Sequence, residues 1–261
     1  MSDSTRSASS TIKNLFAFDS PEYVNRARQV SGDGPKSTST PGTATTVTSL
    51  MRTRHSVRSF WPTPVPRDLL RQVLALAQQT ASNSNCQPWR LKILTGDALQ
   101  RLSSALLEAV KAGVEPTTAP IPEHFKHYRS EFGHLLYGSE GYDIPREDRE
   151  AAETARRRNY KFFDAPVGMI IYIDKSLADV DVMCVGMYLQ SLSLLLAERG
   201  IACCWQVSVA GYPDVVRKEL RIGDEMLVLS GGAVGYEDVN ARPNGIRSAR
   251  DVWQDHAEFV E

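Results

Sequence analysis

The chain has 261 residues, of which 42% are apolar, and it contains 17 glycines and 14 prolines. This length and composition fit one large globular domain or two small ones, and they exclude fibrous, collagen-like and globally disordered proteins. The 30 Lys and Arg residues balance 31 Asp and Glu residues, which leaves a formal net charge of -1. The chain therefore has no general attraction for nucleic acid or an anionic membrane, and a bound anion must be held by a local cluster.

The cysteines and the N-terminus indicate a cytoplasmic protein. Cysteine occurs without CxxC spacing and mostly among apolar residues, at Cys86, Cys184, Cys203 and Cys204, which predicts buried thiols in a reducing compartment. Consecutive side chains of a strand point to opposite faces, so the adjacent pair Cys203 and Cys204 is expected to pack in the core. No signal peptide or membrane span is predicted.

Composition divides the chain near residue 48. Ser, Thr, Gly and Pro dominate residues 31–49, and such a segment cannot bury enough apolar area to offset its ordering entropy. We expect residues 1–48 to form a flexible extension and residues 49–261 to form the folded domain. Within the extension, residues 12–18 and 21–30 have the pattern of a short strand and an amphipathic helix, or simply of two apolar patches.

Helices and strands are mixed along the folded domain without a regular βαβ alternation. A helix at 97–112 is expected to be capped by Asp97 and closed by Gly113, and the apolar run at 167–173 suits a strand buried on both faces. Further strands are predicted over 89–96, 201–209 and 226–235, further helices over 66–79, 146–160 and 213–220, and an irregular surface excursion over 114–148. The fold class is therefore α+β, a sheet with helices around it.

One predicted helix, over residues 181–199, is apolar on nearly every side and ends at Gly200. Such a helix must be covered all round, either inside one chain or by a second subunit. We favour a dimer on this ground.

Several familiar catalytic motifs are absent from the sequence. It contains no GxGxxG after a strand, no GxxxxGK[ST], no GxSxG and no HExxH, so nucleotide hydrolysis, Rossmann-type binding and serine or zinc hydrolysis lose their usual support. His124, His127 and His134 lie in the excursion, but no Cys or acidic ligand completes a metal-binding set there. We therefore predict no metal site.

The densest cluster of chemically useful residues is RTRHSVRSF, at residues 52–60. If this segment is extended or part of a turn, Arg54, Ser56 and Arg58 point together and form a cationic, hydroxyl-bearing face suited to a phosphate monoester. Taken alone, the segment also fits a solvated basic turn.

Two further clusters carry polar or basic side chains. TASNSNCQPW, at residues 80–89, offers more neutral donors and acceptors than an ordinary turn needs, and these suit ribityl hydroxyls or the edges of a heterocycle. ARPNGIRSAR, at residues 241–250, places Arg247 and Arg250 after a buried strand and a turn, and alone it resembles a basic tail.

Together the three clusters resemble the nitroreductase family of FMN-dependent oxidoreductases. The similarity runs from about Leu50 to the C-terminus and includes RHSVRSF, ASNSNCQPW, the CCWQVSVAGYPD segment of residues 203–214, and the final RSAR. The stretch at 142–168 looks most like the branch that contains nitrobenzoate reductases. The resemblance implies a mixed or antiparallel central sheet and a domain-swapped homodimer with two FMN sites, each built from both chains.

The resemblance also implies a role for each matching residue. Arg54 and Ser56 would meet the flavin phosphate and ribityl chain, Arg58 would approach the pyrimidine edge at N1 and the C2 carbonyl, and His55 would contribute mainly its backbone. The other expected contacts are Ser82, Asn83 and Asn85 in the polar turn, Gln206, Val207, Ser208 and Val209 near N5, and Arg250 with Arg247 at the phosphate. Trp205 departs from the commoner family pattern and leaves the shape of the pocket open.

The implied activity is hydride transfer from NADH or NADPH to FMN and then to a nitroaromatic compound, which gives nitroso and hydroxylamine products in a ping-pong cycle. Arg58 would stabilise the reduced flavin electrostatically, and no side chain would act as a nucleophile. Three alternatives stay open: reduction of a quinone or other conjugated acceptor, oxygen-dependent flavin chemistry, and a flavin-binding protein without turnover. The sequence does not separate NADH from NADPH, because it has no Rossmann acidic residue.

Overall fold

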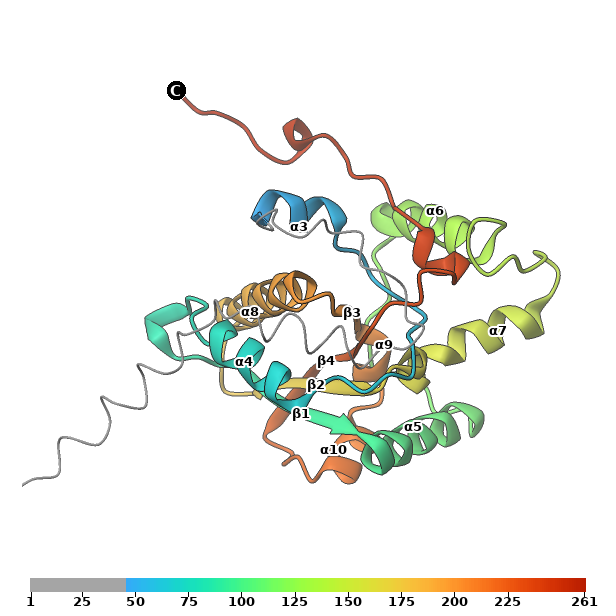
Figure 1. Cartoon of the computed structure of the whole chain (residues 1–261), viewed down its shortest axis with the longest axis horizontal. Coiled ribbons are helices and arrows are strands. Elements are labelled where there is room, and N and C mark those ends of the chain that lie inside the picture. The colour runs from blue at the N-terminus through green and yellow to red at the C-terminus, as the bar shows by residue number, and fades with distance from the viewer. Residues whose placement is uncertain (1–45) are drawn as a thin grey trace, which may run out of the picture. The chain divides into compact units, whose positions relative to one another are not determined.

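The computed structural model describes residues 46–261 (Figure 1). Most of the predicted extension, including the patterns at 12–18 and 21–30, lies outside the described residues. A short helix, α3 (Val47–Thr53), begins the described part, with the Thr46 side chain accepting a hydrogen bond from the Ser49 amide. The expected boundary at residue 48 therefore falls inside a helix.

A four-stranded antiparallel sheet forms the centre, in the order β1-β2-β4-β3. Its strands are β1 (Arg90–Thr95), β2 (Val167–Asp174), β3 (Ala202–Gln206) and β4 (Met226–Gly235). The prediction of a central buried strand at 167–173 is confirmed, because β2 pairs with both β1 and β4. Outside these strands, Ser56 forms an isolated parallel bridge to Cys203, so the chain after α3 lies along the edge of β3.

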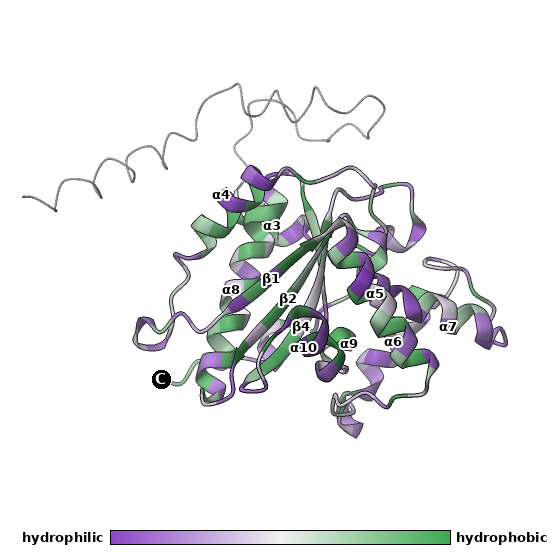
Figure 2. Cartoon of the chain, turned by 90° about the horizontal axis from the view of Figure 1, so that it is seen from below, coloured by the Kyte–Doolittle hydropathy of each residue, from purple (hydrophilic) through white to green (hydrophobic). Residues whose placement is uncertain are grey.

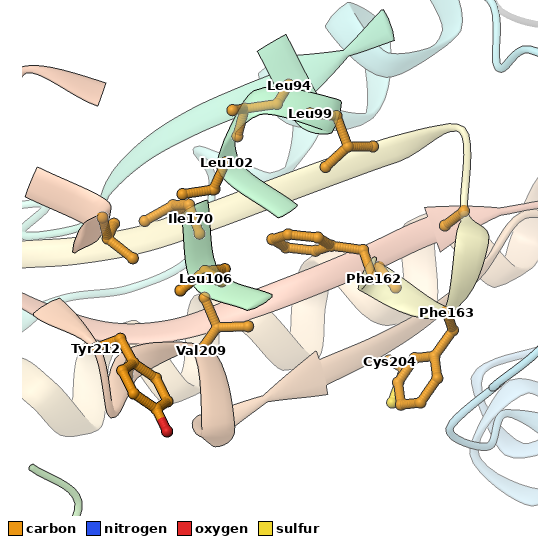
Figure 3. Packing of buried hydrophobic residues seen from close by; sticks show 14 of the residues in the cluster. Leu94, Leu99, Leu102, Leu106, Phe162, Phe163, Ile170, Cys204, Val209 and Tyr212 are labelled. Carbon is orange, nitrogen blue, oxygen red and sulfur yellow. The ribbon is translucent and has the colours of Figure 1, made fainter. Parts of the chain in front are cut away.

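Side chains alternate between two cores, one on each face of the sheet. Met169, Ile171 and Cys203 belong to the core that packs against α4 (Arg67–Ala77) and α8 (Asp179–Glu198). Ile170 and Cys204 point the other way, toward α5 (Gly96–Lys111), α9 (Val207–Ala210) and α10 (Pro213–Leu220) (Figure 3). The α+β class is confirmed, and the strands are mostly apolar beside helices of mixed character (Figure 2).

The adjacent cysteines pack as expected. Cys203 and Cys204 are buried on opposite faces of the sheet, and burial raises the pKa of the Cys203 thiol to about 11. Neither thiol is therefore a ready nucleophile at neutral pH.

The excursion at 114–148 contains more structure than the sequence predicts. It holds the 3₁₀ turn η3 (Glu123–Phe125) and a twelve-residue helix, α6 (Lys126–Tyr137). Only Leu136 is buried on α6, so the helix lacks the broad apolar stripe by which a sequence pattern is recognised. The helix expected at 146–160 divides into α7 (Arg149–Arg157) and the 3₁₀ segment η4 (Arg158–Asp164).

Two other predicted boundaries need correction. The strand expected at 201–209 ends at Gln206, because the chain turns into α9 at Val207. The N-cap of α5 is Thr95 and not Asp97, which lies in the first turn where its charge favours the helix dipole. Gly113 follows α5 with φ +75°, a conformation that glycine adopts without strain, as predicted.

Helix α8 is long and apolar enough to cross a membrane by length and composition. In the fold, Cys184, Tyr188, Leu192 and Leu196 instead bury its inner face against the sheet. Its apolar character is therefore explained in part by core packing. The opposite face leaves Met183 and Met187 exposed.

Candidate functional site

The segment after α3 is extended, which is one of the two conformations that the sequence left open. Arg54 ends the helix with φ -62° and ψ 138°, and the Val57 amide donates to the carbonyl oxygen of Cys203 at 3.3 Å. Val57 is buried in the core that faces α5. Its neighbours Ser56 and Arg58 are only partly buried, and both lie near Cys204.

The Arg58 guanidinium is the best-positioned cation of this segment. Its Nη1 donates to the Ser56 carbonyl oxygen at 3.0 Å, and its Cζ lies 4.9 Å from the centre of the Phe132 ring on α6. Within residues 46–261 no carboxylate forms an ion pair with it, and a guanidinium has five N–H donors. Charge and donors are therefore left for a ligand.

Two polar residues lie beside Arg58. Burial raises the pKa of the Cys204 thiol and of the Tyr142 hydroxyl, and the nearby guanidinium opposes both shifts. Arg158 also lies over the Tyr142 ring, with its Cζ 5.8 Å from the ring centre. The Tyr142 hydroxyl is buried without a hydrogen-bond partner among the described residues. Arg58 is thus partly buried, with a second guanidinium, that of Arg158, beside the Tyr142 ring.

Asn244 fixes the main chain at Arg58, a role that the sequence did not reveal. Its Oδ1 accepts from the Arg58 amide at 2.7 Å, while its Nδ2 donates to the carbonyl oxygens of Ser59 and Asp238, each at 2.8 Å. The side chain is 1% exposed. A Pro-Asn-Gly sequence after a buried strand is typical of a turn, and only its spatial position identifies the amide as a clamp.

His55 is held by its side chain, in addition to any backbone contribution. Its Nδ1 lies 3.0 Å from the Thr53 carbonyl oxygen, and its Nε2 lies 2.9 Å from Oε1 of Glu237. Glu237 follows β4 and pairs with Phe60 through an isolated bridge. The imidazole therefore joins the extended segment to the end of the sheet and has no free ring nitrogen for a ligand.

The polar turn lies elsewhere in the chain, at the N-terminal end of α8. The Asn83 amide donates to Sγ of Cys184 at 3.3 Å, and Ser82 Oγ accepts from the Gln87 amide at 3.0 Å. Asn85 adopts φ +56° and accepts from the Gln87 side chain. No hydrogen bond or ion pair within residues 46–261 joins this turn to Arg58, and α4 and α8 lie together on the side away from α6 (Figure 1).

The junction of β3 and α9 combines a buried amide with an exposed apolar residue. Gln206 is 2% exposed, and its Nε2 donates to the Asn159 carbonyl oxygen at 2.7 Å, but its Oε1 has no donor among the described residues. Val207 is 63% exposed, and Ser208 is partly buried. The Val209 side chain is fully buried in the core, so only its main chain is left for a cofactor.

Trp205 does not face Arg58. Its Nε1 donates to Ser193 Oγ of α8 at 2.9 Å, and its ring covers Gly232, where an added Cβ would clash with it. This places the indole on the α8 side of the sheet, whereas Arg58 lies near Cys204 on the opposite side. Trp205 therefore does not narrow the space at Arg58 in the same chain.

Arg247 and Arg250 are exposed and fold back on their own main chain. Arg247 Nη1 donates to the Asn244 carbonyl oxygen at 2.7 Å, and Arg250 Nη1 donates to Ser248 Oγ at 2.7 Å. Neither forms an ion pair with a carboxylate in the part of the chain that the structure describes. Both guanidiniums are thus available to an anion.

The donors present fit FMN as a group. Uncompensated guanidiniums and the Ser56 hydroxyl suit a terminal phosphate and a polyol, and Arg58 suits the electron-rich pyrimidine edge. The orphaned Oε1 of Gln206, buried beside the exposed Val207, is an acceptor for an N–H group. In the described residues, no group of three His, Cys, Asp or Glu side chains is placed to hold a metal ion.

We predict that Asn244→Ala lowers the free energy of unfolding by about 1 to 3 kcal/mol, because the Arg58 amide loses its partner, while the carbonyl oxygens of Ser59 and Asp238 each keep one main-chain donor. Chemical denaturation measures this change. Asn240→Ala is the control, because Asn240 is exposed and only its main-chain amide forms a hydrogen bond. Equal stability of the two variants would contradict the proposed role of Asn244 in fixing the Arg58 main chain.

Comparison with known proteins covers most of the chain. The model of the nitroreductase family matches residues 51–236. A 4-nitrobenzoate reductase from Pseudomonas putida is 32% identical over 81% of this chain and 94% of its own length. A nitrobenzene nitroreductase from Ectopseudomonas oleovorans is 30% identical over 82% of this chain and 96% of its own length.

Solved structures give the same result. The FMN and NADPH-dependent nitroreductase NfnB from Sphigopyxis sp. strain HMH superimposes with a TM-score of 0.79 at 30% identity, over 83% of this chain and 99% of that chain. NfnB from Mycobacterium smegmatis, in complex with NADPH, gives a TM-score of 0.75 at 30% identity, over 81% and 96%. From its sequence and its fold alike, this chain belongs to the nitroreductase family.

Proposed function

We propose that the chain is an FMN-dependent oxidoreductase that transfers hydride from NAD(P)H to nitroaromatic compounds, giving nitroso and hydroxylamine products in a ping-pong cycle. Relatives that cover most of the chain are named as reductases of 4-nitrobenzoate and nitrobenzene, and two similar structures are described with FMN and NADPH. The observation that carries the proposal is Arg58, a guanidinium without a carboxylate partner in the described chain, fixed by Asn244 and covered by Phe132.

The residues that would hold FMN come from four places in the chain. Arg54 and Ser56 would bind the phosphate and ribityl chain, and Arg58 would bind the pyrimidine edge. The remaining contacts would come from Ser82, Asn83 and Asn85 in the polar turn, from residues 206–209 at the β3–α9 junction, and from Arg247 and Arg250 at the phosphate. Bound FMN would supply hydride transfer at its N5 atom.

The chain's own residues would act by binding and electrostatics. Arg58 would stabilise negative charge at the pyrimidine edge, and its guanidinium is partly buried with the Phe132 ring centre 4.9 Å from its Cζ. Asn244 would act as a positioning residue, since it holds the Arg58 main chain and does not itself face outward. Val207 would offer an exposed apolar surface beside the ring.

A homodimer would bring the separated parts of the site together. Within one chain the polar turn contacts α8, whereas Arg58 contacts Phe132 of α6, so the two parts of the site are separated. On α8, Val180, Met183 and Met187 follow helical spacing and are all exposed, which is an apolar stripe suited to a second copy. The C-terminal residues 247–261 are exposed throughout, and Trp253, Phe259 and Val260 suit an arm that docks on a partner. These features support a domain-swapped arrangement.

Composition and the cysteines support the proposed domain organisation and cellular location. We propose the extension at residues 1–48 and the folded domain at 49–261, with α3 beginning close to this boundary. All four cysteines are free, and three of them are buried, which supports a reducing cytoplasmic environment.

We expect the purified protein to be yellow and to release FMN, not FAD, on denaturation. In an anaerobic cuvette, NADPH or NADH should bleach the flavin, and 4-nitrobenzoate should restore its colour. A colourless protein that FMN cannot reconstitute would contradict cofactor binding. Flavin that is bleached but not reoxidised by any nitroarene would contradict the proposed acceptor.

Arg58→Ala should slow flavin reduction by NAD(P)H ten- to a thousandfold at saturating FMN, because about 1.5 to 4 kcal/mol of electrostatic stabilisation is lost. Its flavin reduction potential should also fall. Arg250→Ala is the matched control: it should weaken FMN binding by about 1.5 to 3 kcal/mol, yet recover most of its rate once FMN is saturating. Stopped-flow reduction and potentiometry measure both effects. Equal rate losses in the two loaded variants would show that Arg58 is not at the ring.

Removal of residues 1–45 should leave a dimer with bound FMN, because α3, α8 and all proposed flavin contacts lie later in the chain. Paired charges on α8, introduced as Met183→Glu with Met187→Glu, should instead produce monomers with reduced flavin content. Sedimentation velocity with absorbance at flavin wavelengths distinguishes these states. A stable, flavin-loaded monomer of the unmodified chain would refute the shared site.

A further inference from the structure

The Tyr142 hydroxyl is a buried polar group outside the residues assigned to FMN. Its oxygen is shielded from solvent and has no hydrogen-bond partner among the described residues. A buried hydroxyl without a partner costs free energy, so such a group calls for a ligand or an ordered water. Burial raises the Tyr142 pKa, so the hydroxyl keeps its proton at neutral pH and is a hydrogen-bond donor.

A tight turn after α6 fixes the main chain at Tyr142. The Tyr142 amide donates to the Leu136 carbonyl oxygen at 2.8 Å, and the Ile144 amide donates to the Tyr137 carbonyl oxygen at 2.9 Å. A Cβ at Gly141 would clash with the Leu136 carbonyl oxygen, so the turn requires glycine there. Residue 142 is therefore held against the last turn of α6.

This turn brings Tyr142 to the surroundings of Arg58. Phe132, whose ring centre lies 4.9 Å from Arg58 Cζ, is four residues before Leu136 and shares its side of α6. Arg158 is the second cation here, with its Cζ 5.8 Å from the centre of the Tyr142 ring. A guanidinium has donors only, so neither arginine can accept the hydrogen of the hydroxyl.

Gln206 supplies an unpartnered group of the opposite kind in the same region. Its Oε1 is buried without a donor among the described residues, although its Nε2 is bonded to the Asn159 carbonyl oxygen. Gln206 is two residues after Cys204 on β3, so the two side chains point to the same face of the sheet. Cys204 in turn lies near Tyr142. One ligand with an acceptor atom and an N–H group would satisfy both Tyr142 and Gln206.

We propose that Tyr142 is a further flavin-binding residue, whose hydroxyl donates a hydrogen bond to the C2 carbonyl oxygen of FMN beside Arg58. The pyrimidine edge of a flavin carries carbonyl oxygens and an N–H group, which match the unpartnered donor and acceptor. Because this edge gains negative charge on reduction, the hydroxyl stabilises the reduced ring more than the oxidised ring. The inference rests on the proposed function, since it assumes that FMN occupies this space.

The test is Tyr142→Phe, which removes only the hydroxyl, with Tyr188→Phe as the matched control. Tyr188 also has a buried hydroxyl without a partner among the described residues, but it lies in the core on the α8 side of the sheet. In the FMN-loaded, full-length protein, Tyr142→Phe should release FMN at least fivefold faster and lower the flavin reduction potential. Tyr188→Phe should change the release rate less than twofold and leave the potential unchanged. Flavin fluorescence after dilution and potentiometry measure the two effects.

A flavin analogue tests which atom the hydroxyl meets. In 2-thio-FMN a sulfur replaces the C2 oxygen and accepts hydrogen bonds weakly, so Tyr142→Phe should speed the release of 2-thio-FMN less than the release of FMN. Equal effects on the two flavins would overturn the assignment to the C2 carbonyl oxygen.

The outcomes separate this inference from the proposed function. If Tyr142→Phe alters neither release nor potential while the unmodified protein is yellow and is bleached by NADPH, the hydroxyl binds water and the proposed function stands. Equal changes in Tyr142→Phe and Tyr188→Phe would show a general loosening of the fold and would also overturn the proposal. If the unmodified protein binds no FMN, the proposed function fails, and this inference fails with it.

Discussion

The candidate site depends on one buried carboxamide. Asn244 uses both ends of its amide to tie the Arg58 amide, the Ser59 carbonyl oxygen and the Asp238 carbonyl oxygen into one unit. The Asn244 side chain is buried, and the Arg58 amide has no other partner among the described residues, so leaving that amide unpaired would be costly. The clamp joins the segment after α3 to the turn after β4, two regions far apart in sequence. The position of the Arg58 guanidinium follows from that connection.

The sheet and the excursion at residues 114–148 supply two further parts of the site. The antiparallel sheet, buried on both faces, supplies a rigid edge along which residues 54–58 lie. The excursion supplies α6, whose Phe132 covers Arg58 while most of the helix stays exposed. A site that admits two different substrates in turn combines a rigid support with a lightly packed cover. Here the sheet is the support and α6 is the cover.

Strong apolar patterns were predicted well from the sequence. The bounds of α10 and β4 match, because Pro213 marks a helix start and a long apolar run marks a buried strand. Helices α6 and α3 were not predicted, because their apolar patterns are weak. Leu136 is the only buried residue of α6, and Leu50 is the only buried residue of α3. The clamp at Asn244 and the cover at Phe132 depend on long-range contacts, which no local pattern records.

The separation of the polar turn from Arg58 has a thermodynamic consequence for the proposed dimer. If one FMN is bound by the turn of one chain and by Arg58 of the other, FMN binds the dimer and not the monomer. Mass action then requires that FMN tighten association and that association tighten FMN binding by the same factor. The exposed stripe of Met183 and Met187 alone would give an apolar, undirected contact. A shared cofactor adds direction, because only one arrangement of the two chains completes its polar contacts.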